Sequence, residues 1–258
     1  MKQKIRLGII SALSEEQQGL VEAMYSPATL THGMRDYVTG TLWEIDAVCV
    51  LSRLGKVAAA MTAAILVDKF EVTHIVFTGV AGSADADVQI GDLVIAETLV
   101  QHDMDVRPLF PRFQVPLTGL SHFPSSLPLS DTLAQAADDF LALDFAQAIA
   151  APALKEFGLG RPQLHRGLIG SGDQFISERL RLDQLKLALP ELLAVEMEGA
   201  AVAQVCFELG IPFAVIRTIS DHADAAAAVV FMRFVKAIAS TYALCIVKRL
   251  CQRLAAAP

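Results

Sequence analysis

The chain has 258 residues, of which 53% are hydrophobic and 19% charged, with a formal net charge of −7 and a mean hydropathy of +0.46. The negative charge provides no basic surface for a phosphate backbone, which argues against a nucleic-acid-binding protein. A membrane-spanning helix needs ~20 consecutive, mostly apolar residues, and charged residues interrupt the apolar runs before that length, so we expect no membrane segment.

Short runs rich in β-branched residues alternate with alanine-rich segments, which predicts strands that alternate with helices. These runs are apolar at nearly every position, which is typical of a sheet covered on both faces. No linker divides the chain, so the expected fold class is α/β, with a single domain (1–258) around a mixed, twisted sheet flanked by helices. We expect strands at residues 5–11, 46–52, 74–80, 92–100, 166–172 and 212–220.

The segments between these strands read as helices. The first has a capping residue, Ser14, followed by acidic residues that complement the helix dipole. Residues 103–124 are instead rich in Pro and Phe and predict a long loop, and loops of more than ~12 residues are usually functional or disordered. We expect helices at residues 14–24, 55–70, 131–150, 178–189, 199–209 and 226–254.

Ligands of an open α/β sheet bind beyond the carboxyl ends of its strands. Five segments of this chain carry polar or small residues at such positions. They are SALSEE (11–16), TGVAGS (78–83), SGDQFIS (171–177), VEMEGA (195–200) and RTISDHAD (217–224). TGVAGS permits close approach of a ligand to the backbone, but it matches neither the Walker loop nor the GxGxxG dinucleotide motif.

Two carboxylates in apolar surroundings are the most informative candidates. Glu198 lies at a strand-to-helix junction, where it either caps the helix or binds a ligand such as the two hydroxyls of a ribose. Asp221 follows a buried-looking strand, where it either caps a turn or acts as a general acid. Moving the pKa of an aspartate to near neutrality requires about 4 kcal/mol, which burial and a hydrogen bond to a purine nitrogen can supply.

The other polar residues indicate no metal or cofactor chemistry. The six histidines show no paired-ligand spacing and the four cysteines form no CxxC pair, and no nucleophile elbow supports a hydrolytic triad. The short apolar stretch near the N-terminus runs into Glu15 and Glu16, unlike a secretory signal. We therefore expect a cytoplasmic protein without metal or cofactor.

Eight segments, in this order along the chain, resemble the 5′-methylthioadenosine/S-adenosylhomocysteine nucleosidases, a branch of the purine nucleoside phosphorylase superfamily. They are GIISALSEE (8–16), LSRLGKVAAA (51–60), TGVAGS, IGDLVIAE (90–97), HDMD (102–105), GLIGSGDQFI (167–176), VEMEGAAVAQVC (195–206) and RTISDHAD. The resemblance implies a single α/β domain around a partly barrel-like sheet. It also implies a homodimer that uses no cofactor and hydrolyses the bond between adenine and a thio-substituted ribose.

The resemblance also implies roles for individual residues. Asp221 would protonate adenine N7 with help from Ser220, Glu16 would activate the attacking water, and Glu198 would hold the ribose hydroxyls. Arg217 would pair with Glu16 or Glu198. The remaining substrate contacts would come from Met197 at the sugar, Phe175 and Ile176 at the adenine, the turn residues Val80, Ala81 and Gly82, and the apolar residues Leu13, Leu54, Phe231 and Phe234.

Two features depart from the family pattern. Val80 replaces a serine that many of these enzymes have, and loop 103–124 differs from the versions usual in the family, with Phe110, Pro111 and Phe113 as candidates for closing the pocket of a partner subunit. The catalytic set would equally serve a nucleosidase for another 5′ substituent, of futalosine or 5′-deoxyadenosine type. A non-catalytic storage or binding protein is the third hypothesis, and the presence of all three acids argues against it.

Overall fold

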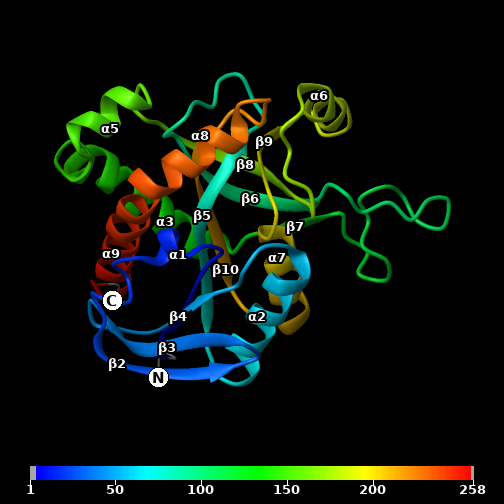
Figure 1. Cartoon of the computed structure of the whole chain (residues 1–258). Coiled ribbons are helices and arrows are strands. Elements are labelled where there is room, and N and C mark those ends of the chain that lie inside the picture. Colours follow the sequence, from blue (N-terminus) through cyan, green and yellow to red (C-terminus); the bar gives the residue numbers. More distant parts are fainter. Residues whose placement is uncertain (1–3, 257–258) are drawn as a thin grey trace.

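The structure, a computed structural model, describes residues 4–256 and is built on one mixed sheet whose centre closes into a barrel (Figure 1). In the barrel each strand is hydrogen-bonded to the next, and the last strand pairs with the first. Taken around the ring, these five strands are β5 (His74–Ser83), β10 (Phe213–Asp221), β6 (Leu93–Gln101), β8 (Leu164–Ser171) and β9 (Leu192–Glu196). The partly barrel-like α/β fold expected from the resemblance is confirmed.

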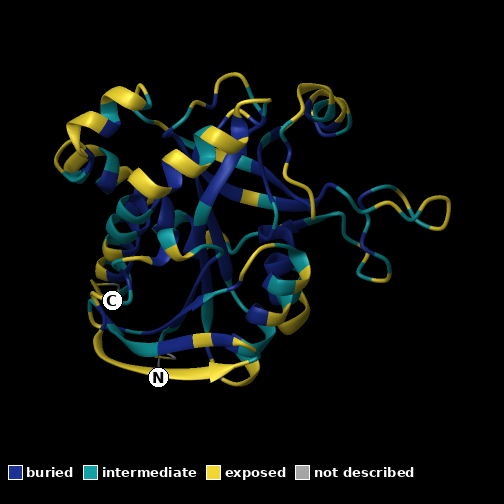
Figure 2. Cartoon of the chain, in the orientation of Figure 1, coloured by how far each residue is buried: buried dark blue, intermediate teal, exposed yellow. Residues whose placement is uncertain are grey.

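The rest of the sheet extends from β5. Strand β1 (Arg6–Ser11) pairs in parallel with β5 and with β4 (Ile45–Leu51), and the antiparallel hairpin of β3 (Arg35–Leu42) and β2 (Tyr25–His32) forms the outer edge. Short β7 (His122–Pro124) pairs with β6. Figure 2 shows that the barrel strands are buried, whereas β2 is exposed along its length.

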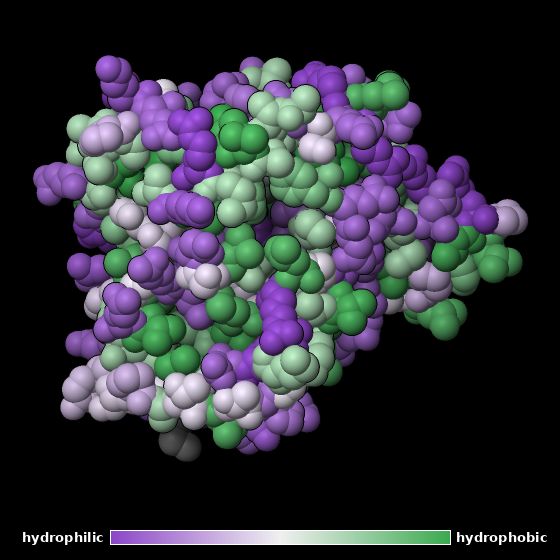
Figure 3. Space-filling model, viewed as in Figure 1, coloured by the Kyte–Doolittle hydropathy of each residue, from purple (hydrophilic) through white to green (hydrophobic). Residues whose placement is uncertain are grey.

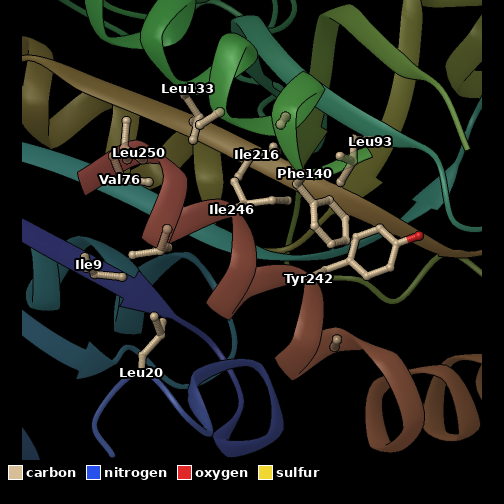
Figure 4. Close-up of a cluster of buried hydrophobic side chains, with 14 of the residues drawn as sticks. Ile9, Leu20, Val76, Leu93, Leu133, Phe140, Ile216, Tyr242, Ile246 and Leu250 are labelled. Carbon is tan, nitrogen blue, oxygen red and sulfur yellow. The ribbon is translucent and has the colours of Figure 1, made fainter. Parts of the chain in front are cut away.

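Helices cover both sides of the sheet. Helices α2 (Lys56–Asp68) and α7 (Gly199–Leu209) pack against each other on one side, and α3 (Leu127–Asp139) and α9 (Ser240–Ala256) pack together on the other. Figure 4 shows side chains of α9 meeting Ile9, Val76 and Ile216 of the sheet. The other helical elements are α1 (Ser14–Gln17), η1 (Phe140–Asp144), α4 (Phe145–Ala148), α5 (Ala151–Glu156), α6 (Arg179–Ala188), α8 (Ala227–Phe234) and η2 (Val235–Ala239), where η denotes a π-helical turn.

All six expected strands are present, but four others were not predicted: β2, β3, β7 and β9. The expected helix 14–24 is wrong beyond Gln17, because the chain turns at Gly19, whose φ is +89°. The expected helix 131–150 begins earlier, at Leu127, and includes the π-helical turn η1.

One helical run contradicts the expectation that charges interrupt every apolar stretch. Within residues 4–256, the run Ala227–Ala256 is long and apolar enough to cross a membrane by length and composition, and its most apolar stretch of 18 residues has a mean hydropathy of 1.6. Its side chains Phe234, Tyr242 and Ile246 are fully or almost fully buried against the sheet and α3. The buried part of this run, 39% of its most apolar window, therefore belongs to the core of the fold.

Candidate active site

A cavity of about 270 Å³ opens where the carboxyl ends of β1, β5, β9 and β10 meet. Its walls are mostly apolar, and among the described residues that line it none is Lys, Arg or His. Four carboxylic acids are among its lining residues. The lining consists of Ala12, Leu13, Glu16, Leu54, Val80, Ala81, Gly82, Gln174, Phe175, Ile176, Val195, Glu196, Met197, Glu198, Asp221 and Phe231.

Glu16 is held in place by backbone amides. Its Oε2 accepts hydrogen bonds from the N–H groups of Ala12 and Leu13, at 2.8 and 2.9 Å, and its Oε1 accepts one from Val80 at 3.1 Å. The close approach needs Gly79, because a Cβ there would lie 2.9 Å from Glu16 Oε1. Burial raises the pKa of Glu16, opposed by the charge of Arg217 and by these N–H groups.

Glu196 forms the buried ion pair of the site. Its carboxylate accepts hydrogen bonds from Arg217, from the hydroxyl of Ser171 and from the backbone N–H of Gly199. The Arg217 guanidinium also lies over the Phe77 ring, 4.0 Å from its centroid. The predicted pairing of Arg217 with Glu16 or Glu198 is therefore wrong, because the guanidinium pairs instead with Glu196, the last residue of β9.

Glu198 lies two residues further on, in the turn between β9 and α7. Its Oε1 accepts a hydrogen bond from the backbone N–H of Gly55 at 2.8 Å. Burial and the neighbouring charge of Glu196 raise the pKa of Glu198 to about 8, although Arg217 and the Gly55 N–H oppose them. Glu198 precedes the first residue of α7, but its side chain makes no capping hydrogen bond, so the alternative of a simple helix cap is excluded.

Asp221 ends β10, just beyond a bulge. The pairing of β10 with β5 shifts register between Ile219 and Asp221, and such bulges re-aim side chains beside active sites. Asp221 Oδ2 accepts a hydrogen bond from the Ser220 hydroxyl at 2.8 Å, and Oδ1 accepts one from the N–H of Ala223 at 2.9 Å. Burial raises the pKa of Asp221 above its ordinary value, and these two bonds oppose the rise.

Two aromatic rings form an apolar wall of the cavity. Phe175 and Phe231 meet edge to face, with centroids 5.7 Å apart, and Phe175 remains 45% exposed. Exposed Leu54 lines the cavity from the segment before α2. The cavity thus combines a flat aromatic surface with a ring of buried carboxylic acids.

Most of the predicted site residues lie together here, and a few do not. Ser220 and Arg217 lie behind the lining and contact it through Asp221 and Glu196. Phe234 does not line the cavity, because it packs on Phe157 and Tyr242 in the core. Phe110, Pro111 and Phe113 are likewise absent from the lining of their own chain's cavity.

Sequence reasoning missed four lining residues: Ala12, Gln174, Val195 and Glu196. All four lie in segments that were singled out at strand ends, SALSEE, SGDQFIS and VEMEGA, and the paired glutamates of VEMEGA were a further signal for Glu196. Within the described part of the chain, no group of three or more His, Cys, Asp or Glu side chains is placed to hold a metal ion.

The chain is similar to known proteins over nearly its whole length. The family model described as the phosphorylase superfamily matches residues 6–251. A 5′-methylthioadenosine/S-adenosylhomocysteine nucleosidase from Marinomonas sp. is 34% identical over 240 residues, which is 93% of this chain and 96% of that protein.

Two solved structures are similar in fold and sequence. The 5′-methylthioadenosine/S-adenosylhomocysteine nucleosidase of Neisseria meningitidis, in complex with methylthio-immucillin-A, matches with a TM-score of 0.84 and 31% identity, over 96% of this chain and 98% of that one. The futalosine hydrolase of Helicobacter pylori matches with a TM-score of 0.80 and 30% identity, over 95% of this chain and 97% of that one.

Proposed function

This chain belongs to the phosphorylase superfamily and, within it, to the 5′-methylthioadenosine/S-adenosylhomocysteine nucleosidases, and from that premise we propose how it acts on its substrates. It is an N-glycosyl hydrolase that releases adenine and a 5-thio-substituted ribose from 5′-methylthioadenosine and S-adenosylhomocysteine. The observation that carries the proposal is the convergence of Glu16, Glu198 and Asp221 on one cavity, each with different hydrogen-bond partners.

Cleavage of an N-glycosidic bond leaves positive charge on the sugar and negative charge on the base, as in the oxocarbenium-like transition states of glycosidases. The reaction therefore needs an acid at the base, an anion near the sugar and a group that activates water. Carboxylic acids can fill all three roles if their surroundings give them different protonation states.

Asp221 is proposed as the acid that protonates adenine N7. Its buried position favours the protonated form, which an acid must have before the reaction. The Ser220 hydroxyl and the Ala223 N–H contact both carboxyl oxygens and so fix the orientation of the group. Phe175, which lines the cavity and is 45% exposed, is proposed to stack on the flat adenine, and the backbone of Ile176 to contact the purine edge.

Glu16 is proposed to activate the attacking water, and Glu198 to bind the ribose hydroxyls, with Met197 packed against the sugar. Each of the two groups is held by backbone N–H groups, so neither needs to reorganise during the reaction. At Glu16, Arg217 and three N–H groups oppose the effect of burial and favour the ionised form that a base needs, whereas Glu198, with a pKa raised to about 8, can donate to or accept from a ribose hydroxyl. Arg217, paired with Glu196, is proposed to balance the negative charge behind the sugar without touching the substrate.

Water is the proposed acceptor because the cavity repels phosphate. Phosphate sites use Arg or Lys side chains and free backbone N–H groups. No cationic side chain is among the described lining residues, and the N–H groups of Ala12, Leu13 and Val80 are already used by Glu16. Val80, in place of the usual serine, still serves through its backbone.

A second candidate differs only in the 5′ substituent. The similarity to a futalosine hydrolase is nearly as close as that to the nucleosidases, and both groups share the architecture that would hold an adenine nucleoside or its analogue. The apolar residues Leu13, Leu54 and Phe231 favour a thioalkyl group over a polar one. The choice between the two activities depends on these walls and not on the acids.

We propose that the chain works as a homodimer. Loop 103–124 projects from the body (Figure 1) and carries Leu109 and Leu117, which are 81% and 93% exposed, and apolar side chains gather at its tip (Figure 3). Phe110 and Pro111 remain candidates for contacting a partner's pocket. Phe113 does not, because it is buried in its own chain. The four free cysteines are consistent with the cytoplasm, which we propose as its location.

The deciding experiment compares adenine release from 5′-methylthioadenosine, S-adenosylhomocysteine, adenosine and aminodeoxyfutalosine, with and without added phosphate. We expect release from the first two substrates and no acceleration by phosphate. Preference for aminodeoxyfutalosine would favour the second candidate, and no release from any of the four would refute the enzymatic function.

A further inference from the structure

The side chain of Lys56 joins segments that follow three different strands beside the cavity. Its Nζ donates to Asp103 Oδ1 at 2.6 Å and to Gln101 Oε1 at 3.2 Å, while its backbone N–H donates to Asp173 Oδ1 at 2.8 Å. The side chains of Lys56 and Asp103 are only 16% and 18% exposed. Such a pair is less screened than the surface ion pairs that contribute little to stability.

The two aspartates are also joined to each other. Asp103 Oδ2 accepts a hydrogen bond from the backbone N–H of Asp173 at 2.9 Å. Partial burial would raise the pKa of Asp103, but the bonds from Lys56 and from the Asp173 N–H outweigh it and lower the pKa, so Asp103 stays ionised. We call Lys56, Asp103 and Asp173 the Lys56 clamp.

Two members of the Lys56 clamp, Lys56 and Asp173, are each next in sequence to a residue that contacts Glu198 or lines the cavity. Gly55 precedes Lys56, and its N–H makes the 2.8 Å hydrogen bond to Glu198 Oε1. Asp173 precedes Gln174 and the aromatic wall residue Phe175, both of which line the cavity. A Cβ at Gly55, where φ is +93°, would lie 3.0 Å from Asp173 Oδ1, so these two segments are closely packed.

We propose that the Lys56 clamp positions Glu198 and the aromatic wall for the reaction, with Lys56 as its central positioning residue. This inference rests on the function proposed above. The hydrogen bond from Gly55 holds one oxygen of Glu198, which leaves the other free for a ribose hydroxyl. Without the Lys56 cation, the start of α2 keeps its backbone hydrogen bond to Asp173 but loses the Nζ bonds to Gln101 and Asp103 and the 4.0 Å contact with Asp173 Oδ2. Segment 171–176 and the Glu198 carboxyl group are then held less firmly.

The test is a double-mutant cycle between Lys56→Met and Glu198→Gln, measured as kcat/KM for adenine release from 5′-methylthioadenosine. Lys56→Met should lower kcat/KM by about 10- to 100-fold, the cost of misplacing a catalytic group. If Lys56 acts through Glu198, the double variant should have a kcat/KM less than about threefold below that of Glu198→Gln alone. Lys56→Arg, which can still pair with Asp103, should recover most of the activity.

The matched control is Arg249→Met on α9. Arg249 forms a partly shielded ion pair with Asp144, with side chains 28% and 29% exposed, and neither residue lines the cavity. Its removal tests whether the loss of any half-buried ion pair lowers activity. We expect kcat/KM within about threefold of the parent.

Hydrogen–deuterium exchange provides a readout that does not depend on turnover. Lys56→Met should speed exchange in segments 52–56 and 171–176, and Arg249→Met should not. The proposal would be overturned if the two substitutions lowered kcat/KM independently, so that the fold-losses multiplied in the double variant. It would also be overturned if Lys56→Met left hydrogen–deuterium exchange unchanged in both segments. If the parent releases adenine from no nucleoside, the proposed function fails, and the exchange result alone then decides whether the clamp exists.

Discussion

Substitution of Asp221 by Asn removes the proposed acid with little change in shape. The Asn oxygen can still accept the hydrogen bond from the Ala223 N–H, and Ser220 can rotate to accept from the new amide. What is lost is the proton that the carboxylic acid gives to adenine. General acid catalysis contributes typically 10²- to 10⁴-fold, which corresponds to about 2.7–5.4 kcal/mol of the activation barrier.

The stability of the same variant separates loss of chemistry from loss of fold. Because burial raises the pKa of Asp221 in the folded chain, the parent loses stability as pH rises from the unfolded pKa of the group through its folded pKa. Asn has no such titration. The Asp221→Asn variant should therefore be at least as stable as the parent at pH 7 and above, while its activity is far lower.

The assay is adenine release from 5′-methylthioadenosine across a pH series, with thermal unfolding of both proteins at each pH. The parent should lose activity on the alkaline side as Asp221 gives up its proton, and the variant should lack that limb. The N7-acid assignment would be wrong if purified Asp221→Asn retained kcat within about threefold of the parent.

Three further substitutions test other parts of the site. Glu16→Gln should lower kcat by at least about 100-fold while an adenine nucleoside inhibitor still binds, because an amide cannot take a proton from water; unchanged kcat would exclude Glu16 as the base. Ser220→Ala should move the alkaline limb of the pH–activity profile to higher pH. In the parent the Ser220 hydroxyl lowers the pKa of Asp221, and the variant lacks it; a move to lower pH would contradict this. Arg217→Met should cost about 3–5 kcal/mol in urea unfolding, because it leaves Glu196 buried without its cation; a cost under about 1 kcal/mol would show that the pair contributes little.

The strands of the barrel were predictable because they are buried on both faces and therefore read as continuous apolar runs. The hairpin β2–β3 was not predictable by the same rule, because every residue of β2 is exposed. Its turns gave no signal either. In the turn between β2 and β3, Gly33 and Met34 have φ of +55° and +61°, and in the turn between β3 and β4, Trp43 and Glu44 have φ of +44° and +72°. Neither turn has the Asn-Gly pair that marks such hairpins.

The candidate site was predictable in position but not in its internal pairing. Strand ends drew attention to Glu16, Glu198 and Asp221, and the structure places all three at one cavity. The partner of Arg217 could not be read from sequence, because Glu196 and Glu198 are two residues apart and the turn after β9 decides which of them faces the guanidinium. Tertiary geometry settles a choice that local sequence leaves open.

The high mean hydropathy divides into two parts with different causes. A closed barrel has no edge strands, so β10 is buried at all nine of its positions, and the apolar helix Ala227–Ala256 covers the sheet from one side. That part is explained by one subunit. Exposed apolar side chains on loop 103–124 and at the start of α2, such as Leu117 and Val57 at 93% and 82% exposure, are not. Exposed apolar patches mark interaction sites, so the apolar side chains that gather at the tip of loop 103–124 (Figure 3) are consistent with the proposed second subunit.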